Sequence, residues 1–316
     1  MAGIVEQILS LATMAYQYVL LLLDICRLIF QTTILYITAI WHIFKPPPPK
    51  SVSGEIVLIT GTGHGIGREL ALQYSRLGAK VVCLDINEVN NNKTIGEIKR
   101  EGGAAWGYKC DVSNREDVRA VSQKVRDEVG DVTVLVNNAG IMPCKPFLKH
   151  TPDEIERIFK INVFAHYWTL REWLPSFIAS GHGHVVAVSS ICGFMGTANL
   201  VPYCSSKFAI RGLMEGLVEE MRYGGRNTNI KFTTIHPFTI DTGLAQKPRI
   251  RFPVLNPITT PAHCAEAIID GMRRDYETVC VPTRDYYLHI FTGILPNSVR
   301  KVFLDFMDTG VDEHDT

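Results

Sequence analysis

The sequence predicts an α/β protein with a doubly wound parallel sheet, preceded by an N-terminal hydrophobic helical segment. Three observations lead to this prediction. Residues 1–45 carry almost no charge, short apolar runs alternate with amphipathic segments from residue 54 onward, and a glycine-rich turn follows the first of those runs. Alternation of this kind is typical of right-handed βαβ units, whose sheet is covered by helices on both faces.

The first 45 residues have the composition of a membrane anchor. Their charged side chains are Glu6, Asp24, Arg27 and Lys45. Two uncharged runs result, residues 7–23 and 28–44, each close to the length that crosses ~30 Å of hydrocarbon as a helix. Four interpretations are open: a spanning helix followed by an interfacial one, a two-helix hairpin in one leaflet, a cleaved signal peptide, and a buried hairpin of a soluble protein. The missing basic n-region and cleavage site argue against a signal peptide, and we favour an anchor.

A proline-rich linker follows the anchor. Residues 46–49 are four consecutive prolines flanked by Lys45 and Lys50. Such a run favours a stiff polyproline II strut with a reach of roughly 12 Å. The two lysines favour placing this side of the membrane in the cytoplasm.

Seven short apolar or β-branched runs then predict strands. After the first run, apolar residues recur at helical spacing from Ile66 to Leu77, and Gly78 ends that helix. The predicted strands are residues 56–60, 81–85, 104–109, 132–136, 184–188, 230–235 and 279–281. Helical segments separate them, which indicates a doubly wound (Rossmann) sheet.

The composition excludes several classes of protein. Hydrophobic residues are 46% and charged residues 20% of the 316, and Lys+Arg and Asp+Glu balance at 32 each. This excludes a disordered chain, a collagen-like fibre and a protein that binds nucleic acid through a strongly basic surface. None of the eight cysteines forms a CxxC pair. We interpret them as reduced thiols of a cytosol-facing domain and expect neither a disulfide framework nor a metal site.

The turn after the first strand has a spacing that suits a dinucleotide. Residues 60–67 fit the pattern TGxxxGxG with Gly61, Gly65 and Gly67, and do not fit GxGxxG. Glycines there allow a tight strand-to-helix turn and the close approach of a pyrophosphate to the helix N-terminus. A plain turn is the structural alternative, but the position between a strand and a helix favours a cofactor site that also includes Ile66.

Asp85 indicates which dinucleotide binds. It ends the second strand, where a carboxylate accepts hydrogen bonds from the adenosine ribose hydroxyls and repels a 2′-phosphate. No Lys or Arg follows in the next two positions, and the glycine-rich turn contributes only His64. We therefore predict NAD in preference to NADP, with a strand-capping aspartate as the structural alternative.

Two further strand ends extend the predicted cofactor site. Asp111 follows the third strand and could hydrogen-bond the adenine edge, with Val112 packing on its face. An Asn-Asn-Ala-Gly stretch, residues 137–140, closes the fourth strand, and we include Asn138 among the cofactor contacts. Small residues there would let the chain pass beside the cofactor.

The spacing of Tyr203 and Lys207 predicts acid–base chemistry. On a helix, residues four apart lie on one face. A phenol with a pKa of about 10 is a poor acid–base catalyst at neutral pH, and an adjacent ammonium lowers its pKa. Lys207 could also hold the nicotinamide ribose, and Ser190, at the end of the fifth strand, could hydrogen-bond the substrate oxygen. A YxxxK pattern occurs by chance in many helices, but chance explains the whole ordered set poorly.

These motifs, over residues 54–285, resemble the short-chain dehydrogenase/reductase superfamily in its NAD(P)-dependent group. The resemblance implies that Tyr203 is the catalytic acid/base, Lys207 its pKa-lowering partner and Ser190 the substrate-binding hydroxyl. Asn162, in a Lys-Ile-Asn-Val stretch, resembles the asparagine that holds a water in the proton relay.

Residues 237–242 resemble the Pro-Gly stretch that binds the nicotinamide carboxamide, with Ile240 and Thr242 as cofactor contacts. Phe238 replaces the glycine of that motif, a departure that affects the loop conformation and the shape of the substrate pocket.

Within the superfamily the chain is similar to membrane-anchored lipid dehydrogenases, which include epidermal-type retinol dehydrogenases, retinol dehydrogenase 10 and the 17-beta-hydroxysteroid dehydrogenases of lipid droplets. The shared features are the hydrophobic N-terminus, the amino-acid sequences of residues 54–61 and 203–208, the Pro237-Phe238 variant and residues 249–253. The resemblance implies hydride transfer between NAD and a lipophilic alcohol or carbonyl, with retinol and retinal ahead of 17-beta-hydroxysteroids and long-chain or isoprenoid alcohols. An oxidised cytosolic NAD pool favours alcohol oxidation.

The resemblance also implies a place in the cell and an assembly. We expect an endoplasmic reticulum membrane or lipid droplet, a catalytic domain facing the cytosol, and a homodimer. The predicted domains are a membrane anchor at residues 1–45, a linker at 46–53, an NAD-binding catalytic domain at 54–285 with a substrate loop at 243–260, and a C-terminal tail at 286–316. A nucleotide-binding scaffold on membranes or droplets is the alternative of a different class, although the four residues of the catalytic set argue against it.

Overall fold

The computed structural model describes residues 2–223, 229–254 and 256–313, and the chain divides into two units, Met1–Pro49 and Lys50–Thr316. The first unit contains one helix, α1, which runs without interruption over the 43 residues Ala2–Phe44. Both apolar runs lie on this one helix, and the sequence holds neither proline nor glycine between residues 4 and 44 that would interrupt it.

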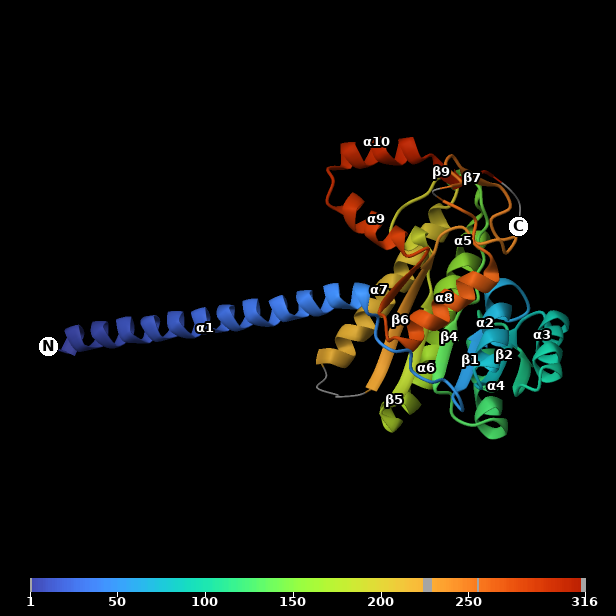
Figure 1. The fold of residues 1–316 in the computed structure, drawn as a ribbon, viewed down its shortest axis with the longest axis horizontal. Helices are drawn as coiled ribbons and strands as arrows, with labels where there is room; N and C mark the ends of the chain where they lie inside the picture. The colour runs from blue at the N-terminus through green and yellow to red at the C-terminus, as the bar shows by residue number, and fades with distance from the viewer. Residues whose placement is uncertain (1, 224–228, 255, 314–316) are drawn as a thin grey trace. The chain divides into compact units, whose positions relative to one another are not determined.

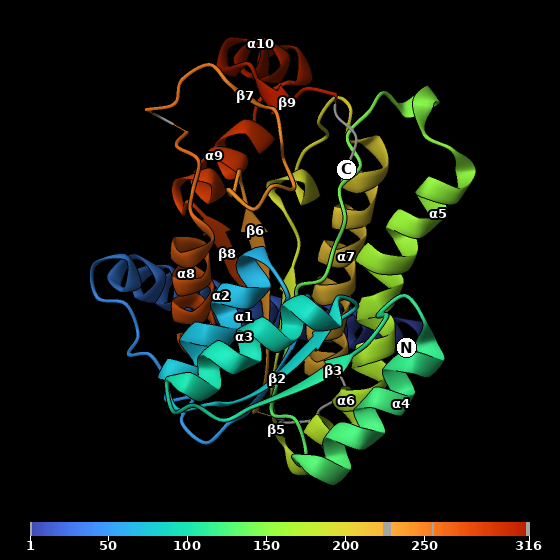
Figure 2. The same cartoon turned by 90° about the vertical axis from the view of Figure 1, so that its right-hand side faces the viewer.

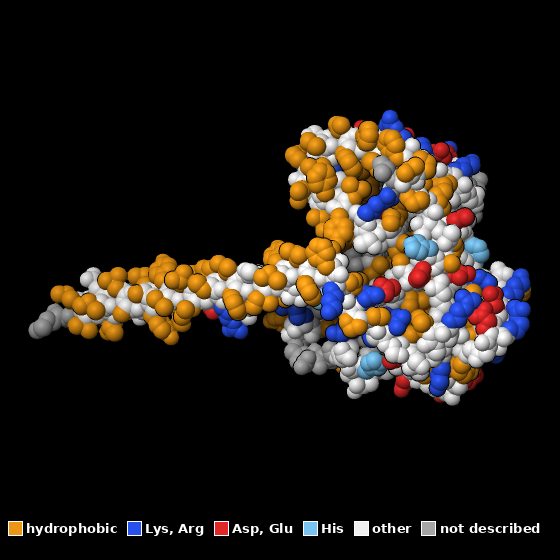
Figure 3. All heavy atoms as spheres, in the orientation of Figure 1, with side chains coloured by type: hydrophobic (Ala, Val, Ile, Leu, Met, Phe, Trp, Pro, Cys, Tyr) orange, Lys and Arg blue, Asp and Glu red, His pale blue; other side chains and the backbone are white. Residues whose placement is uncertain are grey.

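The length and surface of α1 suit a membrane. At 1.5 Å per residue it extends about 65 Å, roughly twice the thickness of a hydrocarbon core. Among the described residues it is the one helix long and apolar enough to span a membrane, and apolar side chains cover it (Figure 3). Its threonines at positions 13, 32, 33 and 38 donate their hydroxyls to carbonyls four residues earlier at 2.7–2.9 Å. These polar groups are therefore satisfied within the helix, as a lipid environment requires.

The second unit is built on a seven-stranded parallel sheet with the order β3-β2-β1-β4-β5-β6-β8. Its strands are β1 (Ile56–Thr60), β2 (Lys80–Asp85), β3 (Ala105–Lys109), β4 (Val134–Asn137), β5 (His182–Val188), β6 (Asn229–Pro237) and β8 (Thr278–Val281). The predicted doubly wound α/β class is confirmed, and each predicted strand overlaps an observed one. A separate antiparallel pair, β7 (Pro248–Ile250) and β9 (Thr309–Val311), was not predicted.

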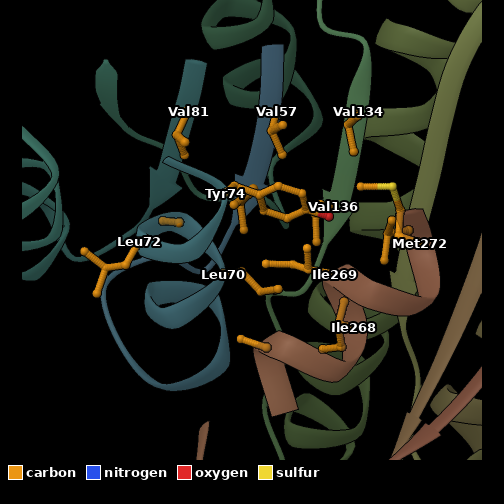
Figure 4. Packing of buried hydrophobic residues seen from close by; sticks show 14 of the residues in the cluster. Val57, Leu70, Leu72, Tyr74, Val81, Val134, Val136, Ile268, Ile269 and Met272 are labelled. Atoms are coloured by element: carbon orange, nitrogen blue, oxygen red, sulfur yellow. The ribbon is translucent and has the colours of Figure 1, made fainter. Parts of the chain in front are cut away.

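Helices cover both faces of this sheet (Figures 1 and 2). One face carries α2 (Gly65–Arg76), α3 (Glu88–Arg100) and α8 (Pro261–Arg273), and the other carries α4 (Arg115–Glu128), α6 (Ala165–Ser180) and α7 (Val201–Tyr223). Strand residues alternate between the two cores: Val57 and Ile59 pack with α2 and α8, whereas Leu58 packs on the opposite side. Figure 4 shows strand valines, Val57 and Val136 among them, facing Tyr74 of α2 and Ile268 of α8.

The strand order reverses between β1 and β4, and the carboxyl ends of these strands meet there. Thr60 closes β1, and its Oγ1 accepts hydrogen bonds from the backbone N–H groups of Asn138 and Ala139, both at 3.0 Å. Ligands of open α/β sheets bind at such a point. A ligand site is therefore expected at the loops that follow β1 and β4.

The segment after β8 is more structured than a tail. It holds α9 (Arg284–Gly293), α10 (Asn297–Met307) and β9. Figure 1 shows α9 and α10 near the β7–β9 pair, above the carboxyl ends of the strands. Residues 284–311 thus join the same end of the sheet as the loops after β1 and β4.

Candidate active site

A cavity of about 340 Å³ lies at the carboxyl ends of the strands. One part of its wall comes from the loops after β1, β2 and β4: Gly61, His64, Gly65, Ile66, Asp85 and Asn138. A second part holds Ser190, Tyr203 and Lys207. A third is largely apolar, with Met142, Met195, Leu200, Leu244, Ala245 and Val311.

The glycine-rich turn has no room for larger residues. Gly61 and Gly65 adopt φ values of +75° and +59°, in the left-handed region that favours glycine. A Cβ on Gly67 would lie 2.0 Å from the carbonyl oxygen of Gly61, so this position must also be glycine. Gly67 itself packs behind the cavity wall, whereas Gly61, Gly65 and Ile66 line it. The turn therefore presents backbone at the start of α2, the arrangement that suits a pyrophosphate.

A buried polar network that sequence reasoning missed supports this turn. Thr62 donates its hydroxyl to Asn91 Oδ1 at 2.6 Å, and Asn91 Nδ2 donates to the carbonyl of Cys83 at 2.9 Å. Thr94 donates to the carbonyl of Thr62 at 3.0 Å. The network ties the turn to β2 and α3, and its only sequence signal is a run of polar residues on an otherwise apolar helix face.

Asp85 lies at the cavity wall as predicted, and its carboxylate is fixed by the backbone. Its Oδ2 accepts from the N–H of Gly63 and its Oδ1 from the N–H of Asn87, both at 2.7 Å. Among the described residues that line the cavity, Lys207 is the only lysine or arginine. The Asp85 end of the cavity thus offers a carboxylate and no cation to a bound nucleotide.

Asn138 and Asp111 differ in their relation to the cavity. Asn138 lines it and donates from Nδ2 to the carbonyl of Thr60 at 2.9 Å, which ties the end of β4 to the end of β1. Asp111 and Val112 are not brought to the wall. Asp111 Oδ1 instead accepts from the N–H and the hydroxyl of Ser113, at 3.0 and 2.7 Å. Val112 is buried in the core next to α4.

The tyrosine, lysine and serine lie together, as their spacing predicts. Tyr203 and Lys207 occupy one face of α7, and the Lys207 Nζ atom is 5.5 Å from the centroid of the Tyr203 ring. Lys207 donates to the carbonyl of Val188 at 2.9 Å, which fixes the ammonium at the end of β5. The Ser190 hydroxyl lies close enough to the Tyr203 phenol to lower its pKa. All three side chains are buried.

Burial controls the acidity of this group. It raises the pKa of Tyr203 above the ordinary value, and the Ser190 hydroxyl lowers it less than burial raises it. We predicted that the Lys207 ammonium lowers the pKa of Tyr203 overall. For the protein alone this prediction is wrong, because burial outweighs any such lowering. Burial also lowers the pKa of Lys207 to about 8, so its ammonium form predominates at pH 7.

Asn162 lies behind the cavity in a π-helical turn, η2 (Lys160–Phe164), of the kind found at functional sites. Its Oδ1 accepts from the N–H of Ile141 and its Nδ2 donates to the carbonyl of the same residue, both at 2.9 Å. A Cβ on Gly140 would lie 3.3 Å from Asn162 Oδ1 and 3.7 Å from Lys207 Nζ. The Asn162 amide and the Lys207 ammonium therefore both lie beside Gly140.

The loop after β6 covers the glycine-rich turn. Pro237, Phe238, Ile240 and Thr242 line the cavity, and a Cβ on Gly65 would meet Thr242 Cγ2 at 3.1 Å. Among the described non-glycine residues, positive φ occurs only at positions 199, 275 and 308. Phe238 therefore adopts a backbone conformation open to any residue, which explains why glycine is not required there.

His236 is a packed residue that supports Ser190. Its Nδ1 donates to the carbonyl of Ser190 at 2.9 Å, and its ring stacks on Phe194 with centroids 3.9 Å apart. Burial lowers the pKa of His236 to about 4, so the ring is neutral at pH 7. It fixes the backbone that carries the serine. In the sequence, only the position of His236 at the end of a predicted strand could have suggested that it supports Ser190.

Comparisons with known proteins agree with this geometry. Residues 55–251 match the model of the short chain dehydrogenase family. Epidermal retinol dehydrogenase 2 of Mus musculus is 40% identical over 270 residues, 85% of this chain and 86% of that protein. The 17-beta-hydroxysteroid dehydrogenase 13 of Homo sapiens is 37% identical over 271 residues, 86% of this chain and 88% of that protein.

Solved structures show the same fold. The 3-ketoacyl-(acyl-carrier-protein) reductase from Brucella melitensis, complexed with NADH, superimposes with a TM-score of 0.67 at 27% identity. The superposition covers 73% of this chain and 98% of that one. The family match spans more than half of the chain and includes the glycine-rich turn, Ser190 and the Tyr203–Lys207 pair. The chain belongs to the short-chain dehydrogenase family.

Proposed function

We propose that this protein is a membrane-associated, NAD-dependent dehydrogenase that interconverts a lipophilic alcohol and its carbonyl, with retinol and retinal as the first candidate pair. The observation that carries the proposal is a single cavity. It joins the glycine-rich turn and Asp85 to the Ser190–Tyr203–Lys207 group and then to an apolar wall.

The proposed chemistry needs a hydride acceptor and a proton acceptor. NAD, when bound, supplies the hydride acceptor. Tyr203 accepts the proton of the substrate hydroxyl through its phenol oxygen, and Ser190 holds the substrate oxygen. Lys207 stabilises the phenolate, and the route toward Asn162 beside Gly140 carries the proton away. Because burial raises the pKa of Tyr203, the phenol is protonated at neutral pH and has a proton to give to a carbonyl, so the same group serves the reverse reaction.

Asp85 supports the choice of NAD over NADP. Both of its oxygens already accept backbone hydrogen bonds, which fix the carboxylate beside the turn. A 2′-phosphate would meet this negative charge, and among the described residues of the cavity wall Lys207, in the Ser190–Tyr203–Lys207 part, is the one lysine or arginine.

The apolar wall supports a lipophilic substrate. Its side chains, Met142, Met195, Leu200, Leu244 and Val311, offer no hydrogen bond beyond the weak thioethers, so a substrate tail gains affinity there by leaving water. Relatives named as retinol dehydrogenase and 17-beta-hydroxysteroid dehydrogenase make retinol the first candidate and a 17-beta-hydroxysteroid or an isoprenoid alcohol the alternatives.

Membrane association is supported by α1 and by a second apolar surface. Exposed hydrophobic side chains gather on α9 and α10, among them Tyr287, Ile290, Phe291, Val302 and Phe306 (Figure 3). We propose attachment to the endoplasmic reticulum membrane or to lipid droplets with the catalytic domain in the cytosol, and a homodimer as the assembly.

The test is turnover by the full chain in membranes. Formation of reduced nicotinamide is measured with all-trans-retinol, a 17-beta-hydroxysteroid and an isoprenoid alcohol, each with NAD and with NADP. Tyr203→Phe is compared with Tyr223→Phe, a control at an exposed tyrosine on the same helix. Turnover that survives Tyr223→Phe and disappears in Tyr203→Phe supports the proposal. A protein that binds NAD but turns over no alcohol or carbonyl would instead be a scaffold.

A further inference from the structure

A strand from the far end of the chain closes the apolar part of the cavity. Thr309, Gly310 and Val311 of β9 line the cavity, although they come long after Tyr203 in sequence. Val311 packs against the apolar cluster that contains Leu200 and Tyr203. We propose that β9 is the specificity-determining wall of the substrate site and that Arg249 is the residue that holds it there. This inference rests on the proposed alcohol dehydrogenase function.

Arg249 connects β9 to the loop after β6. The residue sits in β7, where it pairs with Gly310 in the antiparallel ladder. Its Nε donates to Asp308 Oδ1 at 3.0 Å and its Nη1 to Asp312 Oδ1 at 2.9 Å, so it bridges the two ends of β9. A Cβ on Gly310 would lie 3.3 Å from Arg249 Nη2, so glycine lets the guanidinium lie close over the strand.

The charge pattern makes this arginine necessary for the strand. Asp308, Asp312 and Glu313 place three carboxylates around a three-residue strand, and like charges at that spacing repel. Arg249 faces two of them, and Lys149 Nζ pairs with both oxygens of Glu313 at 2.8 Å. An isolated exposed pair stabilises little, but a cation shared by two carboxylates removes repulsion that would otherwise separate β9 from β7.

Other contacts aim the strand at the site. The carbonyl of Val311 accepts from Asn199 Nδ2 at 3.1 Å, which joins β9 to the loop before α7. Cys144 Sγ donates to the same carbonyl at 3.7 Å, and Val311 supplies an apolar side chain to the cavity. A long substrate would bury its tail against this wall. A short alcohol reaches Ser190 and Tyr203 without touching it.

The wall therefore affects long substrates selectively. Burying a valine-sized apolar contact stabilises by about 1.5 kcal/mol, which corresponds to roughly tenfold in affinity. Val311→Ala should raise the KM for a long lipophilic alcohol severalfold, and truncation after Asp308 should raise it roughly tenfold or more. The KM for a short alcohol and the affinity for NADH should change less than twofold.

The experiment uses the full chain in membranes with two primary allylic alcohols, one short and one with a long apolar tail. Arg249→Ala, Val311→Ala and the truncated chain are compared with Arg222→Ala, which breaks an exposed ion pair with Glu219 elsewhere on the surface. Hydrogen exchange at the β7 and β9 amides is measured in each. Arg249→Ala should speed exchange in both strands and raise the long-alcohol KM, and charge exchange in Arg249→Asp with Asp312→Arg should restore part of each.

The outcome separates this inference from the proposed function. Equal changes in KM for both alcohols, or a parallel loss of NADH affinity, would show a general structural role and overturn it. Equilibrium binding of the long alcohol in the presence of NADH provides a readout without turnover. If the protein oxidises nothing, yet binds the long alcohol less tightly after Val311→Ala, the proposed function is wrong and the role of β9 in binding the substrate stands. If binding of the long alcohol is unchanged by Val311→Ala, the proposed role of β9 is wrong.

Discussion

Replacing Lys207 with methionine should abolish turnover and remove a pH-dependent free-energy cost that the buried charged lysine imposes on the native state. The lysine is buried and its pKa falls from 10.5 to about 8 because burial disfavours the charged form. Each unit of pKa corresponds to about 1.4 kcal/mol, so the charged lysine costs the native state about 3 kcal/mol. Below pH 8 the lysine is charged in both folded and unfolded chains, and this cost is fully present. Between pH 8 and 10.5 only the native state has released the proton, so stability rises with pH.

Methionine does not titrate, so comparing Lys207→Met with wild type isolates the free-energy cost of burying the charged lysine. The full chain is unfolded with urea in detergent micelles at pH 7 and at pH 10, for wild type, Lys207→Met and the control Lys80→Met at an exposed lysine. The free-energy difference between Lys207→Met and wild type should shift by about 2–3 kcal/mol in favour of wild type at the higher pH. The carbonyl of Val188 loses its partner in the variant, but this costs about the same at both pH values. A difference independent of pH would refute the reasoning.

Three other predictions follow from the site. The rate of alcohol oxidation should rise about tenfold per pH unit up to about pH 8 and level off above that pH. The reason is that turnover needs an ionised Tyr203 beside a charged Lys207, and Lys207 has the lower pKa of the two. A pH profile of kcat/KM checks this prediction. Gly67→Ala should cost about 1–3 kcal/mol in thermal or urea unfolding and weaken NADH binding, since its Cβ would overlap the Gly61 carbonyl, whereas Gly196→Ala meets no atom within 4 Å and should do neither. Asp85→Asn should raise the ratio of kcat/KM with NADP to that with NAD by roughly tenfold, as the removal of a repelled charge predicts, and an unchanged ratio would show that Asp85 does not select the cofactor.

The sheet and the centre of the site were predictable because their signals are local. Each strand is a short apolar run, and a doubly wound parallel sheet places the carboxyl ends of its strands along one edge. Tyr203 and Lys207 need only helical spacing to lie on one face of α7. The glycines at 61, 65 and 67 follow from backbone geometry that a sequence pattern records directly.

The remaining features depend on contacts between distant segments. The substrate end of the cavity is completed by β9, and its pairing with β7 has no local pattern longer than three residues. The acidity of Tyr203 depends on how deeply the fold buries it, which spacing alone does not give. Asp111 has the right position along the chain, but its carboxylate is bound by Ser113 and does not reach the cavity. The two apolar runs of α1 were separated by the charges between them, which do not end a helix in the absence of proline or glycine.

The most direct test of the account follows the hydrogen that leaves the alcohol. All-trans-retinol deuterated at its carbinol carbon is incubated with NAD and membranes that carry wild type, Tyr203→Phe or the control Tyr223→Phe, and the reduced nicotinamide is analysed by mass spectrometry. We predict deuterium on the nicotinamide with wild type and Tyr223→Phe, and a loss of at least about a hundredfold in its rate of formation with Tyr203→Phe. Deuterium transfer at an undiminished rate by Tyr203→Phe would contradict the central claim that this buried phenol moves the proton.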